Sequence, residues 1–224
     1  MRKKFIFVIT ILLGTVLLSA CAGGAVRGSS WPGLAADEKA AYLADGAFVY
    51  AVNLSDGKQL WKYPAERDAK LAFFSTPVVT PDGLVIVGSA GTDYSLIALN
   101  SNDINPETSA PAEAWKFTGA RDRWMAAPLV LENKLFAVNS DGNLYILDLQ
   151  DGQSVKKATV VQIGGRLWSQ PTTDGDRVYI TSLDHSVFAV DANTYEILWH
   201  EDLGGAVPMS AVSSKDHHVK AKSP

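Results

Sequence analysis

The sequence predicts an all-β protein of the β-propeller class, in which four-stranded sheets called blades stack face to face. The first observation is a pattern that recurs four times, an apolar strand ending in Asn or Asp, at residues 50–53, 97–100, 145–148 and 188–191. The repeats are spaced by 47, 48 and 43 residues. Repeating units of that length bury their apolar faces by stacking on their neighbours.

The second observation is the frequency of Asp-Gly pairs between short apolar runs. Both residues tolerate positive φ, so the pair favours the tight turn of a β-hairpin. Third, the sequence after residue 30 contains no amphipathic stretch of helical period and useful length. Short strands joined by tight turns predict an antiparallel meander, and four such strands make one propeller blade. The pairs are Asp45-Gly46, Asp56-Gly57, Asp82-Gly83, Asp141-Gly142, Asp151-Gly152 and Asp174-Gly175.

The propeller is predicted over residues 31–213, with four blades at residues 31–63, 75–117, 126–160 and 169–199. In the second blade, the first strand contains Pro77, which suits an inner or edge strand because proline donates no ladder hydrogen bond. The expected strands of the first two blades are 31–34, 40–43, 48–53 and 58–63, then 75–79, 84–88, 95–100 and 114–117. Those of the last two are 126–129, 135–138, 144–148 and 154–160, then 169–172, 178–181, 187–191 and 196–199.

The end of the chain predicts the beginning of a fifth blade. Residues 207–213 match the spacing of the fourth blade's first strand, and a polar tail without strand pattern follows at 214–224. A single strand without partners would leave an exposed sheet edge. We therefore expect the chain to be a truncated product.

The repeats resemble those of PQQ-like β-propellers. Residues 50–61 and 188–199 carry the family pattern, in which the Trp follows the Asn or Asp by eight positions. The third repeat has Lys156 where this Trp belongs, and the fourth has Tyr195 in place of the pattern's glycine. An indole buries a large apolar area between stacked sheets. The repeat aromatics are therefore expected to be structural core residues, namely Trp61, Trp115 and Trp199.

The first twenty residues read as a lipoprotein signal peptide. A basic start at residues 2–4 precedes an apolar run at 5–18, which is short for a membrane span and typical of a signal. The run leads into a segment that resembles the bacterial lipobox, Leu18, Ser19, Ala20 and Cys21. This resemblance implies a diacylglyceryl thioether on Cys21 and an acylated amine, with residues 21–30 as a flexible tether. The alternative is an ordinary signal peptide with a chance cysteine.

Charge and cysteine content narrow the possible partners. Without the basic start, the chain keeps 17 Lys and Arg against 24 Asp and Glu, a net charge of about −7. Such a balance does not favour nucleic acid or anionic lipid as an electrostatic partner. Cys21 is the only cysteine, which excludes an intramolecular disulfide.

The sequence offers no catalytic constellation. The resemblance to quinoprotein dehydrogenases would imply a calcium site, a catalytic aspartate, an arginine and, in many members, adjacent cysteines. Adjacent cysteines and an oxygen-rich calcium loop are absent. The histidines lack zinc-site spacing, and no Gly-x-Ser-x-Gly elbow occurs. We therefore expect neither an enzyme nor a bound cofactor or metal.

The candidate interaction cluster lies between the second and third blades. Arg121 and Arg123 flank Asp122 and are followed by Trp124, and Arg and Trp dominate interface hot spots. One alternative is that Trp124 packs in the core, as Phe74 and Trp168 would just before their own first strands. The arginines would then form solvated ion pairs with Asp122 or Glu132.

Together these features predict a non-catalytic, extracytoplasmic, lipid-anchored propeller that binds proteins. The family resemblance implies a scaffold in envelope or outer-membrane assembly, with the β-barrel assembly machinery or another envelope protein as partner. Ala22 after the cysteine fits the outer membrane of a two-membrane cell; in a single-membrane cell the domain would lie on the outer face of the plasma membrane. The alternative is a quinoprotein-like oxidoreductase or a ligand-sensing propeller whose site lies in missing blades.

Overall fold

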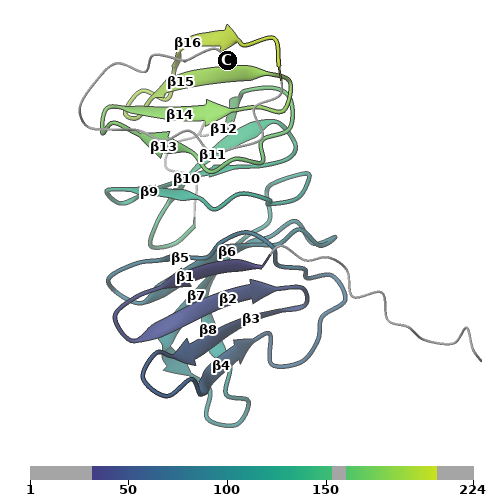
Figure 1. Ribbon diagram of the computed structural model, residues 1–224, viewed down its shortest axis with the longest axis vertical. Helices are drawn as coiled ribbons and strands as arrows, with labels where there is room; N and C mark the ends of the chain where they lie inside the picture. The colour runs from purple at the N-terminus through teal and green to yellow at the C-terminus, as the bar shows by residue number, and fades with distance from the viewer. Residues whose placement is uncertain (1–31, 153–159, 206–224) are drawn as a thin grey trace, which may run out of the picture. The chain divides into compact units, whose positions relative to one another are not determined.

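The computed structural model describes residues 32–152 and 160–205, and its regular elements there are all strands (Figure 1). The predicted signal peptide, Cys21, the tether, the fifth-blade strand at 207–213 and the tail lie outside the described residues. Over the described ranges, no helix has the length and apolar character needed to cross a membrane.

The described strands form four sheets, each an antiparallel meander of four consecutive strands. This confirms the predicted all-β architecture of four-stranded blades. Blade one contains β1 Gly33–Ala36, β2 Ala40–Asp45, β3 Phe48–Asn53 and β4 Gln59–Tyr63; blade two contains β5 Val78–Val79, β6 Leu84–Gly88, β7 Leu96–Ile104 and β8 Pro111–Phe117. Blade three contains β9 Leu129–Leu131, β10 Lys134–Val138, β11 Asn143–Asp148 and β12 Val160–Gln162; blade four contains β13 Thr172–Thr173, β14 Arg177–Thr181, β15 Ser186–Asp191 and β16 Ile197–Asp202.

The first strand of every blade begins later than the sequence predicts. Each begins directly after a proline. In blades two, three and four, the residues before that proline, which the prediction assigns to the strand, are not part of the ladder. Proline has no N–H to donate, so it marks the boundary at which ladder pairing starts. These prolines are Pro32, Pro77, Pro128 and Pro171.

The fourth strand of blade three also differs from the prediction. β12 begins at Val160, where the predicted strand ends, and residues 153–159 are not described. Val160 pairs with Tyr145 as Lys62 pairs with Tyr50. Lys156, which the sequence predicts at the position of the repeat tryptophan, lies outside the described residues.

Each pair of neighbouring blades shares one hydrophobic cluster. We call the face that a blade turns to the next blade in the chain its leading face, and the opposite face its trailing face. Between blades one and two, the cluster joins Tyr42, Ala51 and Trp61 to Val85 and Leu99. The corresponding clusters hold blade two on blade three and blade three on blade four. Because strand residues alternate between faces, each inner blade contributes to two clusters.

The repeat tryptophans occupy equivalent ladder positions but differ in burial. Trp61, Trp115 and Trp199 pair with Ala51, Ala98 and Ala189, respectively. Trp61 and Trp115 are 3% and 7% exposed and lie in the interblade cores, whereas Trp199 is 45% exposed. The expectation that Trp199 is a core residue is therefore wrong, because no described strand covers the leading face of blade four.

Candidate interaction surface

The loop between β8 and β9 is fixed to blade two through Trp124. The Trp124 side chain is fully buried, its backbone N–H donates to Ser89 O at 3.2 Å, and its Nε1–H donates to Tyr94 O at 2.8 Å. Its ring packs 5.4 Å from the ring of Tyr145 on blade three. Trp124 therefore holds two blades together, and its assignment as an interaction residue is wrong.

The core counterparts of Trp124 in the other interblade loops are Phe73 and Leu167. Both are fully buried, in the clusters between blades one and two and between blades three and four. The spacing of the repeats instead predicts Phe74 and Trp168 as the counterparts of Trp124, each one residue after the residue that is buried. Phe74 is half-buried and Trp168 is 43% exposed, so the one-residue shift places the aromatic of the fourth repeat at the surface.

Arg121 and Arg123 are exposed on a backbone that is held from both sides. The Arg121 N–H donates to Asp141 Oδ2 at 3.0 Å, and Arg123 O accepts from Ser140 N–H at 3.0 Å. Asp122 O accepts from Asn139 Nδ2 at 2.9 Å. Among the described residues, ion pairs join Lys58 to Asp56 and Lys116 to Asp93. The ion pairs of the arginines with Asp122 or Glu132, which were the alternative interpretation, are not among them, and this leaves both guanidiniums available.

Asp141 ties this loop to the core of blade three. The Tyr145 hydroxyl donates to Asp141 Oδ2 at 2.5 Å, the same oxygen that accepts the Arg121 N–H. Burial and then this bond to Asp141 raise the pKa of Tyr145 above its ordinary value, so the hydroxyl keeps its proton. One carboxylate thereby fixes the backbone that presents Arg121.

Trp168 extends the surface from the following interblade loop. Its Nε1–H donates to Ser140 Oγ at 2.9 Å, and Ser140 is the residue whose N–H binds Arg123 O. Arg166, two residues earlier, is also exposed, and its carbonyl accepts from Leu183 N–H at 3.0 Å. We call the exposed set the arginine–tryptophan surface: Arg121, Arg123, Arg166 and Trp168.

Sequence reasoning missed Trp168 and Arg166 as members of this surface. The signal that could have found them is the fully apolar Leu167 between them, since neighbouring residues on an extended segment point in opposite directions. With Leu167 in the core, the residues on both sides of it are directed away from the core. The repeat spacing instead favours Trp168, the larger and aromatic residue, over Leu167 as the buried one.

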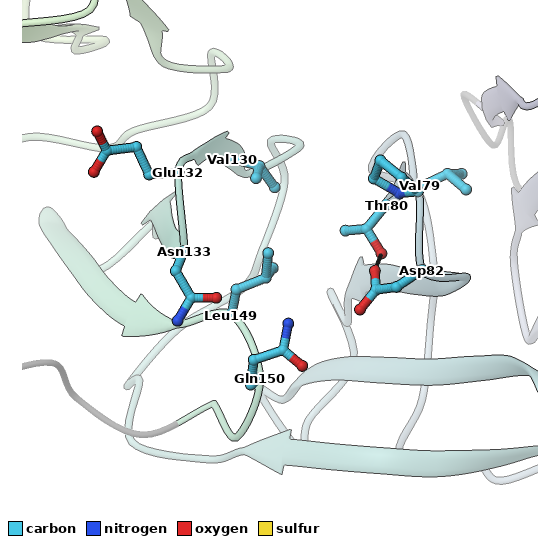
Figure 2. A pocket seen from close by; sticks show the side chains of 9 residues that line it. Val79, Thr80, Asp82, Val130, Glu132, Asn133, Leu149 and Gln150 are labelled. Atoms are coloured by element: carbon cyan, nitrogen blue, oxygen red, sulfur yellow. Dashed lines mark hydrogen bonds between the residues drawn. The ribbon is translucent and has the colours of Figure 1, made fainter.

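A second candidate site is a recess at the turns that join β5 to β6 and β9 to β10. It has a volume of about 360 Å³, and Figure 2 shows the Thr80 hydroxyl bonded to Asp82, with Glu132, Asn133 and Gln150 around the recess. The bond from Thr80 lowers the pKa of Asp82 despite its partial burial. No group of three metal-ligating side chains occurs in the described ranges. The recess offers two carboxylates and two amides without a cation, which makes it a weaker candidate than the arginine–tryptophan surface.

Comparisons with known proteins agree on one family. Residues 14–221 match the family model described as outer membrane protein assembly factor BamB. A curated relative, the outer membrane protein assembly factor BamB of Legionella pneumophila (strain Paris), is 25% identical over 141 residues, which cover 62% of this chain and 32% of the relative.

Solved structures confirm the propeller fold. The crystal structure of BamB from Moraxella catarrhalis matches with a TM-score of 0.57 and 19% identity, covering 79% of this chain and 49% of that one. A computationally designed protein, Ika8, matches with a TM-score of 0.63 and 13% identity, covering 81% and 52%. The chain thus spans about a third of the curated relative's length and about half the length of these solved chains.

Proposed function

The chain belongs to the outer membrane protein assembly factor BamB family of PQQ-like propellers, and from this premise we propose that it is a non-catalytic scaffold in outer-membrane protein assembly. The match over residues 14–221 is the observation that carries the proposal. In this role the propeller binds protein components of the β-barrel assembly machinery, and acylated Cys21 anchors it to the periplasmic side of the outer membrane.

The arginine–tryptophan surface is the part of the chain that we propose contacts the partner. Arg and Trp are enriched among residues that dominate binding energy at protein interfaces. Arg121, Arg123 and Trp168 are exposed, yet their backbones or rings are already fixed by hydrogen bonds to Ser140 and Asp141. A fixed backbone reduces the entropy that is lost on binding. The unpaired guanidiniums favour an acidic partner segment, with which they can form bidentate hydrogen bonds.

A co-isolation experiment tests this function. The full chain, tagged at its C-terminus, is extracted in mild detergent from a two-membrane host, and the co-isolated proteins of the β-barrel assembly machinery are quantified. The Arg121→Ala/Arg123→Ala variant should recover these proteins at least about tenfold less well, since hot-spot side chains contribute about 2 kcal/mol or more.

The matched control changes two exposed cations of blade one, Lys39→Ala/Lys58→Ala, and should recover the machinery as well as the wild-type chain. If the arginine variant recovers the machinery equally well, these side chains are not the contact. If the wild-type chain itself recovers none of it above background, the scaffold function is wrong.

A further inference from the structure

Blade four presents an apolar leading face that no described strand covers. Tyr179, Ala189 and Trp199 form one row across its three outer strands, and the rings of Tyr179 and Trp199 lie 6.1 Å apart. The same row in blade one is Tyr42, Ala51 and Trp61, and there blade two buries all three. Blade four thus has, on its leading face, the same kind of row that blade one uses to pack against blade two.

Blade one presents the complementary trailing face, also uncovered. Leu34 and Leu54 are 63% and 53% exposed. Tyr50 is half-buried, whereas Tyr145, at the equivalent ladder position of blade three, is 3% exposed beneath blade two. On the same trailing face, the ring of Phe48 packs 5.8 Å from that of Tyr50. This face is the kind of surface that the leading face of blade four would require.

We propose that a second copy of this chain covers both faces. Blade four of each copy packs on blade one of the other, so that the two contacts are heterologous and close into a ring. A second copy is the occupant that supplies a trailing face and a leading face at once, because its own blades one and four carry them. Two copies contribute eight described blades, which lies within the known propeller range of about 4–8. This inference does not depend on the proposed function.

The existing interblade contacts specify the hydrogen bonds of this interface. Trp115 Nε1–H donates to Leu149 O at 2.9 Å, and Lys134 Nζ donates to Ala192 O at 3.3 Å. Leu149 and Ala192 each directly follow the Asp that ends the third strand of the next blade.

Leu54 is the residue that follows the third strand of blade one, after Asn53. Trp199 and Arg177 occupy in blade four the ladder positions of Trp115 and Lys134. We therefore place the Leu54 carbonyl of the second copy opposite the indole N–H of Trp199 and the guanidinium of Arg177. Both donors are exposed.

A pair of complementary variants tests the arrangement. Two differently tagged copies of the full chain are co-expressed, extracted in detergent and isolated through one tag, and the yield of the other tag is measured. Trp199→Glu in both copies, or Leu34→Glu in both, damages both contacts of the ring, and the yield should fall at least about tenfold. A Trp199→Glu copy paired with a Leu34→Glu copy keeps one contact fully intact, and the yield should recover.

Val160→Glu is the control, because Val160 is 49% exposed on blade three and lies outside both uncovered faces. It should leave the yield unchanged. Co-isolation through shared detergent micelles would be insensitive to Trp199→Glu and Leu34→Glu as well, so the loss expected for those two variants excludes micelles as the cause. Light scattering should give the mass of a dimer for the wild-type chain. A monomer at tens of micromolar would overturn the proposal, and so would a mixed pair that recovers no better than either single variant.

Discussion

At the scale of single residues, Trp124 joins two blades and also fixes the loop that presents the arginines. We expect Trp124→Ala to lower the free energy of unfolding by about 3–5 kcal/mol, the usual cost of removing a large buried aromatic. Trp124→Phe should cost about 1–3 kcal/mol, since it leaves Tyr94 O without its donor. Urea unfolding of both variants measures this. Trp168→Ala, at an exposed indole, should cost far less, and an equal loss would contradict the assignment.

Two aspartates clamp the turn before the second strand of blades one and four. Asp37 accepts from Lys39 N–H, Ala40 N–H and the Tyr42 hydroxyl, all at 2.7 to 2.8 Å. Asp174 accepts from Asp176 N–H, Arg177 N–H and the Tyr179 hydroxyl. Burial opposes ionisation of both carboxyls, but the hydrogen bonds outweigh it and lower each pKa below the ordinary 3.8. Burial and the bond to Asp37 raise the pKa of Tyr42 to about 12.

These lowered pKa values predict an acid-sensitive contribution to stability. As the pH falls, the two carboxylates are protonated at a higher pH in the unfolded chain than in the folded chain. Their contribution to the free energy of unfolding is therefore complete above pH 3.8 and is lost as the pH falls through the lower pKa of the folded chain. Asp37→Asn/Asp174→Asn should lower the urea midpoint at pH 7, and the difference from the wild-type midpoint should shrink as the pH falls below 3.8. Asp103→Asn, at an exposed carboxylate of β7, is the control. A constant difference between variant and wild type at every pH would refute the clamp.

At the scale of elements, β6 ends at a glycine because the interblade loop passes close to it. A Cβ atom on Gly88 would lie 2.3 Å from the Cβ of Trp124. Gly88→Ala should therefore displace the loop and destabilise the protein by about 1–3 kcal/mol. Gly205→Ala meets no atom within 4 Å and should leave the melting temperature near wild type. Equal melting temperatures for the two variants would show that the loop is not packed against β6.

The repeat spacing in the sequence is sufficient to predict which residues pair in the ladders, but not which side chains are covered by a neighbouring blade. Tyr50, Ile97, Tyr145 and Phe188 do occupy equivalent ladder positions, because a period-2 pattern must keep one face buried. The exposure of Trp199 could not be predicted, since it depends on which strands lie beyond the blade that contains it. The similar exposure of Trp168 could not be predicted either, because a shift of one residue along an extended segment turns a side chain from the core to the surface.

The candidate surface was predictable in part for similar reasons. Arg121 and Arg123 stand out in the sequence as a basic pair in an interblade loop, and both are exposed. Their link to Trp168 runs through Ser140, a residue distant in sequence from both. Such a contact follows from the stacking of blades three and four, and a single repeat carries no sign of it.

At the scale of the whole molecule, we propose that a lipid on Cys21 determines where the propeller acts. We expect Cys21→Ser to remove the attachment site for the acyl chains, which contribute about 0.8 kcal/mol per buried methylene. The variant should lose the acyl label that the wild-type chain takes up from a radiolabelled fatty acid. Equal labelling of the two chains would show that Cys21 is not the modified residue.

The proposed scaffold role requires direct contact with the assembly machinery, and we propose that the arginine–tryptophan surface makes this contact. The most direct measurement places a photoreactive amino acid at Arg123 or, as control, at Lys39, in the full chain within a two-membrane host. After illumination, the position of Arg123 should cross-link to a protein of the β-barrel assembly machinery, and that of Lys39 should not. Identical products from both positions, or none from Arg123 in cells where the propeller is folded, would contradict the account.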